Sequence, residues 1–152
     1  MNKKGVTLIE LIIVFVIIAI MAAFILPGIG SSWLPRYRLR SATRDIVSTL
    51  RTAQIRAISN NLTYQVNLNA GSVGLNNYVL QYQTTAGIWV NEGAVQTLPP
   101  GISIIANTLP ANVAIFNPNF VASAGSVTLQ NTKGATKNFS ITPGTGRVNI
   151  NW

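Results

Sequence analysis

The chain has 152 residues and a formal net charge of +8, from 11 basic and 3 acidic residues, a length that fits one globular domain beside a strongly apolar N-terminal segment. It contains no Cys and no His, which excludes thiolate nucleophiles, disulfide bonds and the commonest metal ligand. The three carboxylates, Glu10, Asp45 and Glu92, are far apart in the sequence, so we expect no acid–base pair, no metal site, no cofactor and no enzymatic activity.

The first element is an apolar helix near the N-terminus. Residues 11–26 are apolar without exception, and with residues 6–10 the segment reaches about the 20 residues that a bilayer crossing needs. We therefore predict a membrane-spanning helix at residues 6–30, kinked at Pro27 because proline lacks a backbone donor. The run is longer than the apolar region of a cleaved secretory signal. An uncleaved signal anchor is the alternative, but it does not explain the ionisable Glu10.

A second, amphipathic helix is expected from Arg36 to about Ser59, where apolar residues recur at three- and four-residue steps. The apolar stripe consists of Leu39, Ala42, Ile46, Leu50, Ala53 and Ala57. The same segment holds six arginines: Arg36, Arg38, Arg40, Arg44, Arg51 and Arg56. Such a cluster suits phospholipid head groups, nucleic acid or an acidic partner subunit, and it is also typical of a solvated helix face.

Beyond Asn61 the apolar spacing changes from 3.6 to 2, which predicts strands. The expected strands are residues 64–68, 78–83, 88–91, 102–106, 113–116, 127–130, 138–142 and 147–152. Short strands joined by short turns favour one or two antiparallel sheets, whose apolar face buries the helical stripe. We therefore predict an α+β fold, in which a long N-terminal helix, first transmembrane and then amphipathic, packs on antiparallel β-sheets.

The N-terminal sequence Lys3-Lys4-Gly5-Val6-Thr7-Leu8-Ile9-Glu10 resembles the processing site of type IV pilins and type II secretion pseudopilins. Both have a short basic leader, a glycine, a glutamate five residues later, and an apolar run ended by a proline, here Pro27. The resemblance implies that a prepilin peptidase cleaves the Gly5–Val6 bond and methylates the new amine of Val6. It also implies that Glu10, about 6 Å or one helical turn further on, pairs with a neighbouring subunit's amine during filament assembly.

Three later segments resemble H-type minor pseudopilins and FimT-like minor pilins: Leu50 to Asn61, Phe116-Asn117-Pro118 and Thr145-Gly146-Arg147-Val148. The resemblance implies a pilin-like structural minor subunit of a type II secretion pseudopilus or a type IV pilus. Its partners would be other pilin or pseudopilin subunits and the prepilin peptidase and methyltransferase. The chain would then consist of a leader (1–5), a filament-forming helix (6–30) and a globular domain (31–152). We expect a single-pass protein of the bacterial inner membrane, with this domain outside the cytoplasm.

An alternative function follows from the C-terminal segment. Some FimT-like minor pilins bind DNA during uptake through a Gly-Arg-x-Arg element, and here Gly146-Arg147-Val148-Asn149 retains the first arginine. Lys133 and Lys137 are expected to form a basic patch with Arg147, which would bind phosphate in a salt-dependent manner. The alternative is therefore a DNA-binding minor pilin of a natural-transformation pilus, with nucleic acid as its partner.

Overall fold

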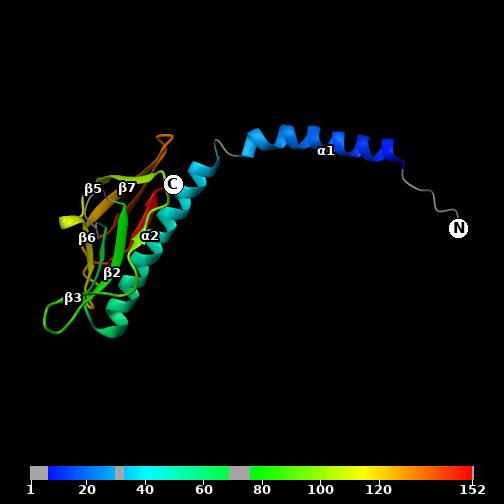
Figure 1. Cartoon of the computed structure of the whole chain (residues 1–152). Helices are drawn as coiled ribbons and strands as arrows, with labels where there is room; N and C mark the ends of the chain where they lie inside the picture. Colours follow the sequence, from blue (N-terminus) through cyan, green and yellow to red (C-terminus); the bar gives the residue numbers. More distant parts are fainter. Residues whose placement is uncertain (1–6, 30–32, 69–75, 152) are drawn as a thin grey trace. The chain divides into compact units, whose positions relative to one another are not determined.

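The computed structural model describes residues 7–29, 33–68 and 76–151, with only the backbone described for residues 24–29. The chain divides into two compact units, which we call the N-terminal unit (Met1–Leu34) and the globular unit (Pro35–Trp152). Figure 1 shows one helix in the first unit, and a second helix together with all the strands in the other.

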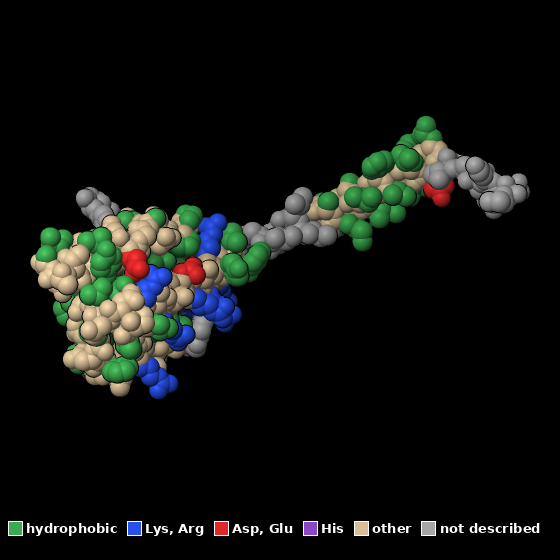
Figure 2. Space-filling view, turned by 90° about the horizontal axis from the view of Figure 1, so that it is seen from below, with side chains coloured by type: hydrophobic (Ala, Val, Ile, Leu, Met, Phe, Trp, Pro, Cys, Tyr) green, Lys and Arg blue, Asp and Glu red, His purple; other side chains and the backbone are tan. Residues whose placement is uncertain are grey.

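Helix α1 (Leu8–Ile29) makes up the described part of the N-terminal unit. It is apolar on all sides, and large hydrophobic side chains cover its surface (Figure 2). The helix continues through Pro27 and ends two residues later. Among the described residues, no helix combines the length and the apolar character that a membrane crossing requires.

Helix α2 (Trp33–Asn60), which belongs to the globular unit from Pro35 onward, begins three residues earlier than predicted. Pro35 is tolerated because the N–H groups of a first helical turn have no acceptor within the helix. The predicted apolar stripe is confirmed: all six of its residues are buried, together with Thr43 and Val47. Asn61 follows the helix with φ +51, a left-handed conformation that asparagine adopts more readily than most residues.

The strands form two antiparallel sheets. The first has the order β3-β2-β1-β6, and β4 also pairs with β2; its strands are β1 (Tyr64–Asn67), β2 (Asn77–Gln83), β3 (Trp89–Asn91), β4 (Gln96–Thr97) and β6 (Val113–Phe116). The second has the order β5-β7-β8-β9, with β5 (Ile102–Asn107), β7 (Gly125–Asn131), β8 (Thr136–Ile141) and β9 (Val148–Asn151). A short 3₁₀ helix, η1 (Pro110–Asn112), precedes β6. All eight predicted strands are present, and β4 is an addition.

One hydrophobic core joins α2 to both sheets. Leu50 of α2, Phe116 of β6 and Phe139 of β8 are each almost fully buried in it. Burying one such side chain contributes roughly 1.5–3 kcal/mol, so the stripe along α2 is a major source of the unit's stability. Figure 1 shows α2 lying along the sheets. The predicted α+β fold is confirmed, and α2 leaves a hollow on each of its two flanks.

Candidate functional site

Two hollows flank α2, and Ser48 lines both of them. We call the first the acidic pocket; it measures about 410 Å³ and is lined by Asp45, Ser48, Thr49, Thr52, Arg56, Tyr78, Leu80, Glu92, Gly93, Ala94 and Gln96. We call the second the arginine groove; it measures about 510 Å³ and is lined by Arg44, Val47, Ser48, Arg51, Arg147, Val148, Asn149 and Ile150. The two hollows are opposite in character, because both carboxylates of the globular unit line the first and three arginines line the second.

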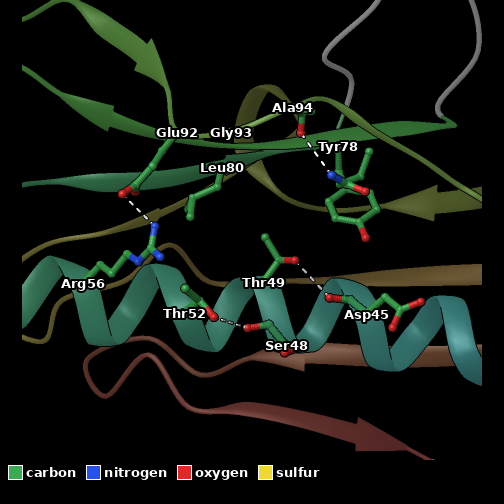
Figure 3. A pocket seen from close by; sticks show the side chains of 11 residues that line it. Asp45, Ser48, Thr49, Thr52, Arg56, Tyr78, Leu80, Glu92, Gly93 and Ala94 are labelled. Carbon is green, nitrogen blue, oxygen red and sulfur yellow. Dashed lines mark hydrogen bonds and ion pairs between the residues drawn. The ribbon is translucent and has the colours of Figure 1, made fainter.

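An ion pair closes one end of the acidic pocket. Arg56 Nη1 lies 2.6 Å from Glu92 Oε1, as Figure 3 shows. The other carboxylate oxygen, Glu92 Oε2, is buried without a hydrogen-bond partner in the described part of the chain. The hydroxyls of Thr49 and Thr52 donate to α2 carbonyls four residues earlier, at 3.0 and 2.9 Å, so these donors are used within the helix.

Tyr78 of β2 contributes the aromatic ring of the acidic pocket (Figure 3). Burial raises the pKa of its phenol above the ordinary value, because desolvation disfavours the phenolate. The negative charge of Asp45 acts in the same direction, and a hydrogen bond with Thr49 opposes both. The phenol therefore stays protonated, and neutral, well into the alkaline range.

The expectation that the carboxylates stay apart is wrong for Asp45 and Glu92, which line the same pocket. They are 47 positions apart in the sequence, and the chain after β3 brings Glu92 over the flank of α2. Glu92 pairs with Arg56, while Asp45 Oδ2 accepts a long hydrogen bond of 3.4 Å from Ser41 Oγ. The described residues contain no group of three or more side chains suited to hold a metal ion.

The arginine groove lies between α2 and β9. Arg44 and Arg51 are seven residues apart and so project from one face of α2. The turn before β9 supplies Arg147, and Gln54 Nε2 fixes this turn on α2 by donating to the Thr145 carbonyl at 2.8 Å. Figure 2 shows basic side chains gathered along one side of the globular unit. Three of the described residues that line the groove are arginines and none of them is acidic, which favours a positive potential.

The three residues of the expected basic patch, Lys133, Lys137 and Arg147, lie toward two different ends of β8. Lys133 lies in the turn between β7 and β8, and Lys137 pairs with Leu129 near the start of β8. Arg147 lies beside Thr142, just past the other end of β8, where its carbonyl accepts the Thr142 N–H at 2.9 Å. Five residues of strand separate Lys137 from Thr142, about 16 Å. Arg147 instead shares its groove with Arg44 and Arg51, which spacing in the sequence did not single out.

Gly5 and Val6, the predicted cleavage site, lie outside the described residues. Glu10 lies in the first turn of α1, and its N–H is 3.4 Å from Thr7 Oγ1 and 3.1 Å from the Thr7 carbonyl. A threonine that caps a helix three residues before a glutamate is the capping-box pattern, in which the carboxylate also supports the helix start. The Thr-x-x-Glu spacing of Thr7 and Glu10 is that of a capping box, and helix capping is therefore a local alternative to the predicted role of Glu10 in assembly.

Comparisons with known proteins agree with both parts of the chain. Residues 1–26 match the family described as the prokaryotic N-terminal methylation motif. The fold is similar to that of the minor pseudopilin EpsH from the type 2 secretion system of Vibrio cholerae, with a TM-score of 0.63 and 10% identity over 75% of this chain and 96% of that one. A second EpsH structure gives a TM-score of 0.61 and 11% identity over 77% and 94%.

The fold is also similar to that of the type IV minor pilin FimU of Pseudomonas aeruginosa, with a TM-score of 0.58 and 13% identity over 77% of this chain and 90% of that one. A search of the curated proteins found no sequence match. The chain thus carries a prepilin-type N-terminal methylation motif and has a pilin-like fold of the minor pseudopilin and minor pilin kind.

Proposed function

We propose that the chain is a structural minor subunit of a type II secretion pseudopilus or a type IV pilus, assembled through its N-terminal helix. The observation that carries the proposal is an N-terminal methylation motif at residues 1–26 on a chain with the fold of a minor pseudopilin. Surfaces rather than a catalytic site perform such a function. The partners would be other pilin or pseudopilin subunits and the prepilin peptidase.

Processing is the first step of the proposed function. Cleavage between Gly5 and Val6 would remove the basic leader and free an amine, which methylation would modify. We predict that the mature protein isolated from its host begins at Val6 and carries one added methyl group, as read by mass spectrometry of the intact chain. Replacing Gly5 with a bulky residue, Gly5→Leu, should leave the precursor uncleaved, because glycine lets the peptide approach the protease closely. Normal cleavage of this variant would contradict the assignment of the site.

Assembly is the second step, and Glu10 is its proposed determinant. A carboxylate in an apolar helix bundle needs a partner of opposite charge. The freed amine of a neighbouring subunit would meet this need and would also set the axial register of the two helices. A capping-box role for Glu10 would make a different demand, because it would need an acceptor oxygen near the Thr7 backbone rather than a negative charge.

We predict that both Glu10→Ala and Glu10→Gln abolish incorporation into the filament and leave the protein in the membrane fraction, as measured by co-purification with the other subunits. Glu10→Gln is the informative variant, because glutamine also completes a capping box but carries no charge. Incorporation of the Glu10→Gln protein at the normal level would assign the residue to helix capping alone. Asp45→Asn, which removes a carboxylate from the globular unit, is the matched control and should assemble normally.

Membrane anchorage through residues 6–30 belongs to the same proposal. Its support is the N-terminal methylation motif together with the uncharged run at residues 11–26. The proposed location is the bacterial inner membrane, with the globular unit outside the cytoplasm.

We do not advance DNA uptake as a second function. Of the three basic residues on which that alternative depends, Lys133 and Lys137 are at the end of β8 away from Arg147. Asn149, at the position of the second arginine of the Gly-Arg-x-Arg element, contacts Thr142 Oγ1 at 3.5 Å and carries no charge. Arg147 remains a candidate contact residue, but its neighbours across the groove are on α2.

A further inference from the structure

The second sheet has β9 as one of its edge strands. In the order β5-β7-β8-β9, strand β9 is terminal and, within the described residues, pairs only with β8. An edge strand presents N–H and C=O groups that an extended peptide can pair with, which makes it a template for an added strand. Four consecutive residues at this edge, Arg147 to Ile150, line the arginine groove.

The groove beside this edge has a definite chemical character. Its floor is aliphatic, because Val47 and Val148 are buried there. Its sides carry Arg44 and Arg51 from α2 and Arg147 from the turn, and none of the described residues that line it is acidic or aromatic. Binding of single-stranded nucleic acid usually relies on aromatic side chains that stack on the bases, and the described lining of this groove includes none. Carboxylates suit it better, because arginine pairs with them in a bidentate manner.

The spacing of side chains along a strand added to β9 can be compared with the spacing of the arginines on α2. Val148 and Ile150 alternate with Asn149, whose side chain reaches Thr142 Oγ1. A strand added beside β9 would direct every second side chain to the same face as Val148, which is the face covered by α2. Those side chains recur about every 6.8 Å, and Arg44 and Arg51 are about 10.5 Å apart along the helix. A segment of about four residues would therefore pass both arginines.

We propose that the arginine groove docks an extended acidic segment of a partner protein, which adds to β9 as a further strand while its carboxylates pair with Arg44, Arg51 and Arg147. Backbone pairing would supply affinity, and the alternate carboxylates would supply specificity. The proposal depends on the proposed function only in naming another filament subunit as the source of this segment. It assigns the globular unit an attachment site that is separate from the N-terminal helix.

The test is a titration of the full-length protein in detergent with a labelled peptide of about six residues in which valine and glutamate alternate. Binding should be saturable and should weaken with added salt. A peptide with lysine in place of glutamate should not bind, and neither should a glutamate peptide whose alternate backbone nitrogens are methylated to block strand pairing. Equal binding by either modified peptide would overturn the proposal.

Variants locate the site. Arg51→Glu should weaken binding of the glutamate peptide roughly tenfold, and so should Arg147→Glu, because each replaces an attraction by a repulsion. Arg36→Glu is the matched control: it makes the same charge change on α2 outside the groove and should bind the peptide nearly as well as the parent. If Arg36→Glu weakened peptide binding as much as Arg51→Glu does, the loss would come from the change in net charge, and the proposal would be overturned.

Two further measurements complete the test. Amide hydrogen exchange of β9 should slow when the peptide binds, because new backbone hydrogen bonds protect its N–H groups. A single-stranded DNA oligonucleotide that bound the groove when the glutamate peptide did not would overturn the proposal in favour of phosphate recognition. The titration needs no filament, so its result is separate from that of the Glu10 variants.

Discussion

Phe120 combines two features that are unusual for a phenylalanine. It is 57% exposed, and its φ of +68 lies in the left-handed region that favours glycine. A turn accounts for the conformation, since the Phe120 N–H donates to the Asn117 carbonyl at 3.2 Å. The side chain therefore adds backbone strain without burying its ring.

We predict that Phe120→Gly stabilises the protein by about 0.5–1 kcal/mol, because glycine removes a steric cost that exceeds its own entropic penalty. Urea unfolding of the detergent-solubilised chain, followed by tryptophan fluorescence, measures the difference. Phe120→Ala is the control, because alanine keeps a Cβ in the same conformation and should give no comparable gain. Equal stabilities of the two variants would rule out backbone strain at this position.

Helix α2 contributes residues both to the hydrophobic core and to the two hollows. Its buried stripe follows from helical periodicity alone, and the structure confirms each predicted position. Its flanks carry Arg44 and Arg51 on one side and Asp45 and Arg56 on the other. The sequence places all four on α2, but only the strands packed beside them decide which hollow each one lines. The strand β4 was not predicted, because its two residues are exposed and are too few to show an alternation of apolar and polar side chains.

We predict that Leu50→Ala on this helix destabilises the globular unit by about 2–5 kcal/mol, because its side chain is fully buried against both sheets. Ile55→Ala on the same helix is the control; Ile55 is 66% exposed, and its truncation should change stability by less than about 0.5 kcal/mol. Thermal unfolding followed by circular dichroism compares the two variants. A cost for Leu50→Ala as small as that for Ile55→Ala would contradict the described packing of α2.

The charge of the whole molecule is unevenly distributed. The globular unit contains only two carboxylates, and both line the acidic pocket, whereas its nine basic residues lie on α2, in turns and on β8. Basic residues follow the apolar segment as well as precede it, so charge alone does not choose an orientation in a membrane. The proposed orientation therefore comes from the pilin-like character of the chain.

We predict that protease added to spheroplasts digests the globular unit, because the proposed function places it outside the cytoplasm. The chain should also remain in the membrane pellet after an alkaline wash. A cytoplasmic protein probed in the same sample controls for lysis and should stay intact. Protection of the globular unit in intact spheroplasts would contradict the proposed orientation.

Features that depend on the spacing of nearby residues could be predicted from the amino-acid sequence. The leader motif, the stripe from Leu39 to Ala57 and the eight strands all follow from fixed spacing, because helices repeat every 3.6 residues and strands every 2. Contacts between residues that are far apart in the sequence became apparent only in the folded structure. The tertiary structure places Lys137 and Arg147 toward different ends of β8, Arg147 in the same groove as Arg51, and Glu92 in the pocket of Asp45. Such neighbours depend on sheet register and on helix packing across the chain, which no local pattern encodes.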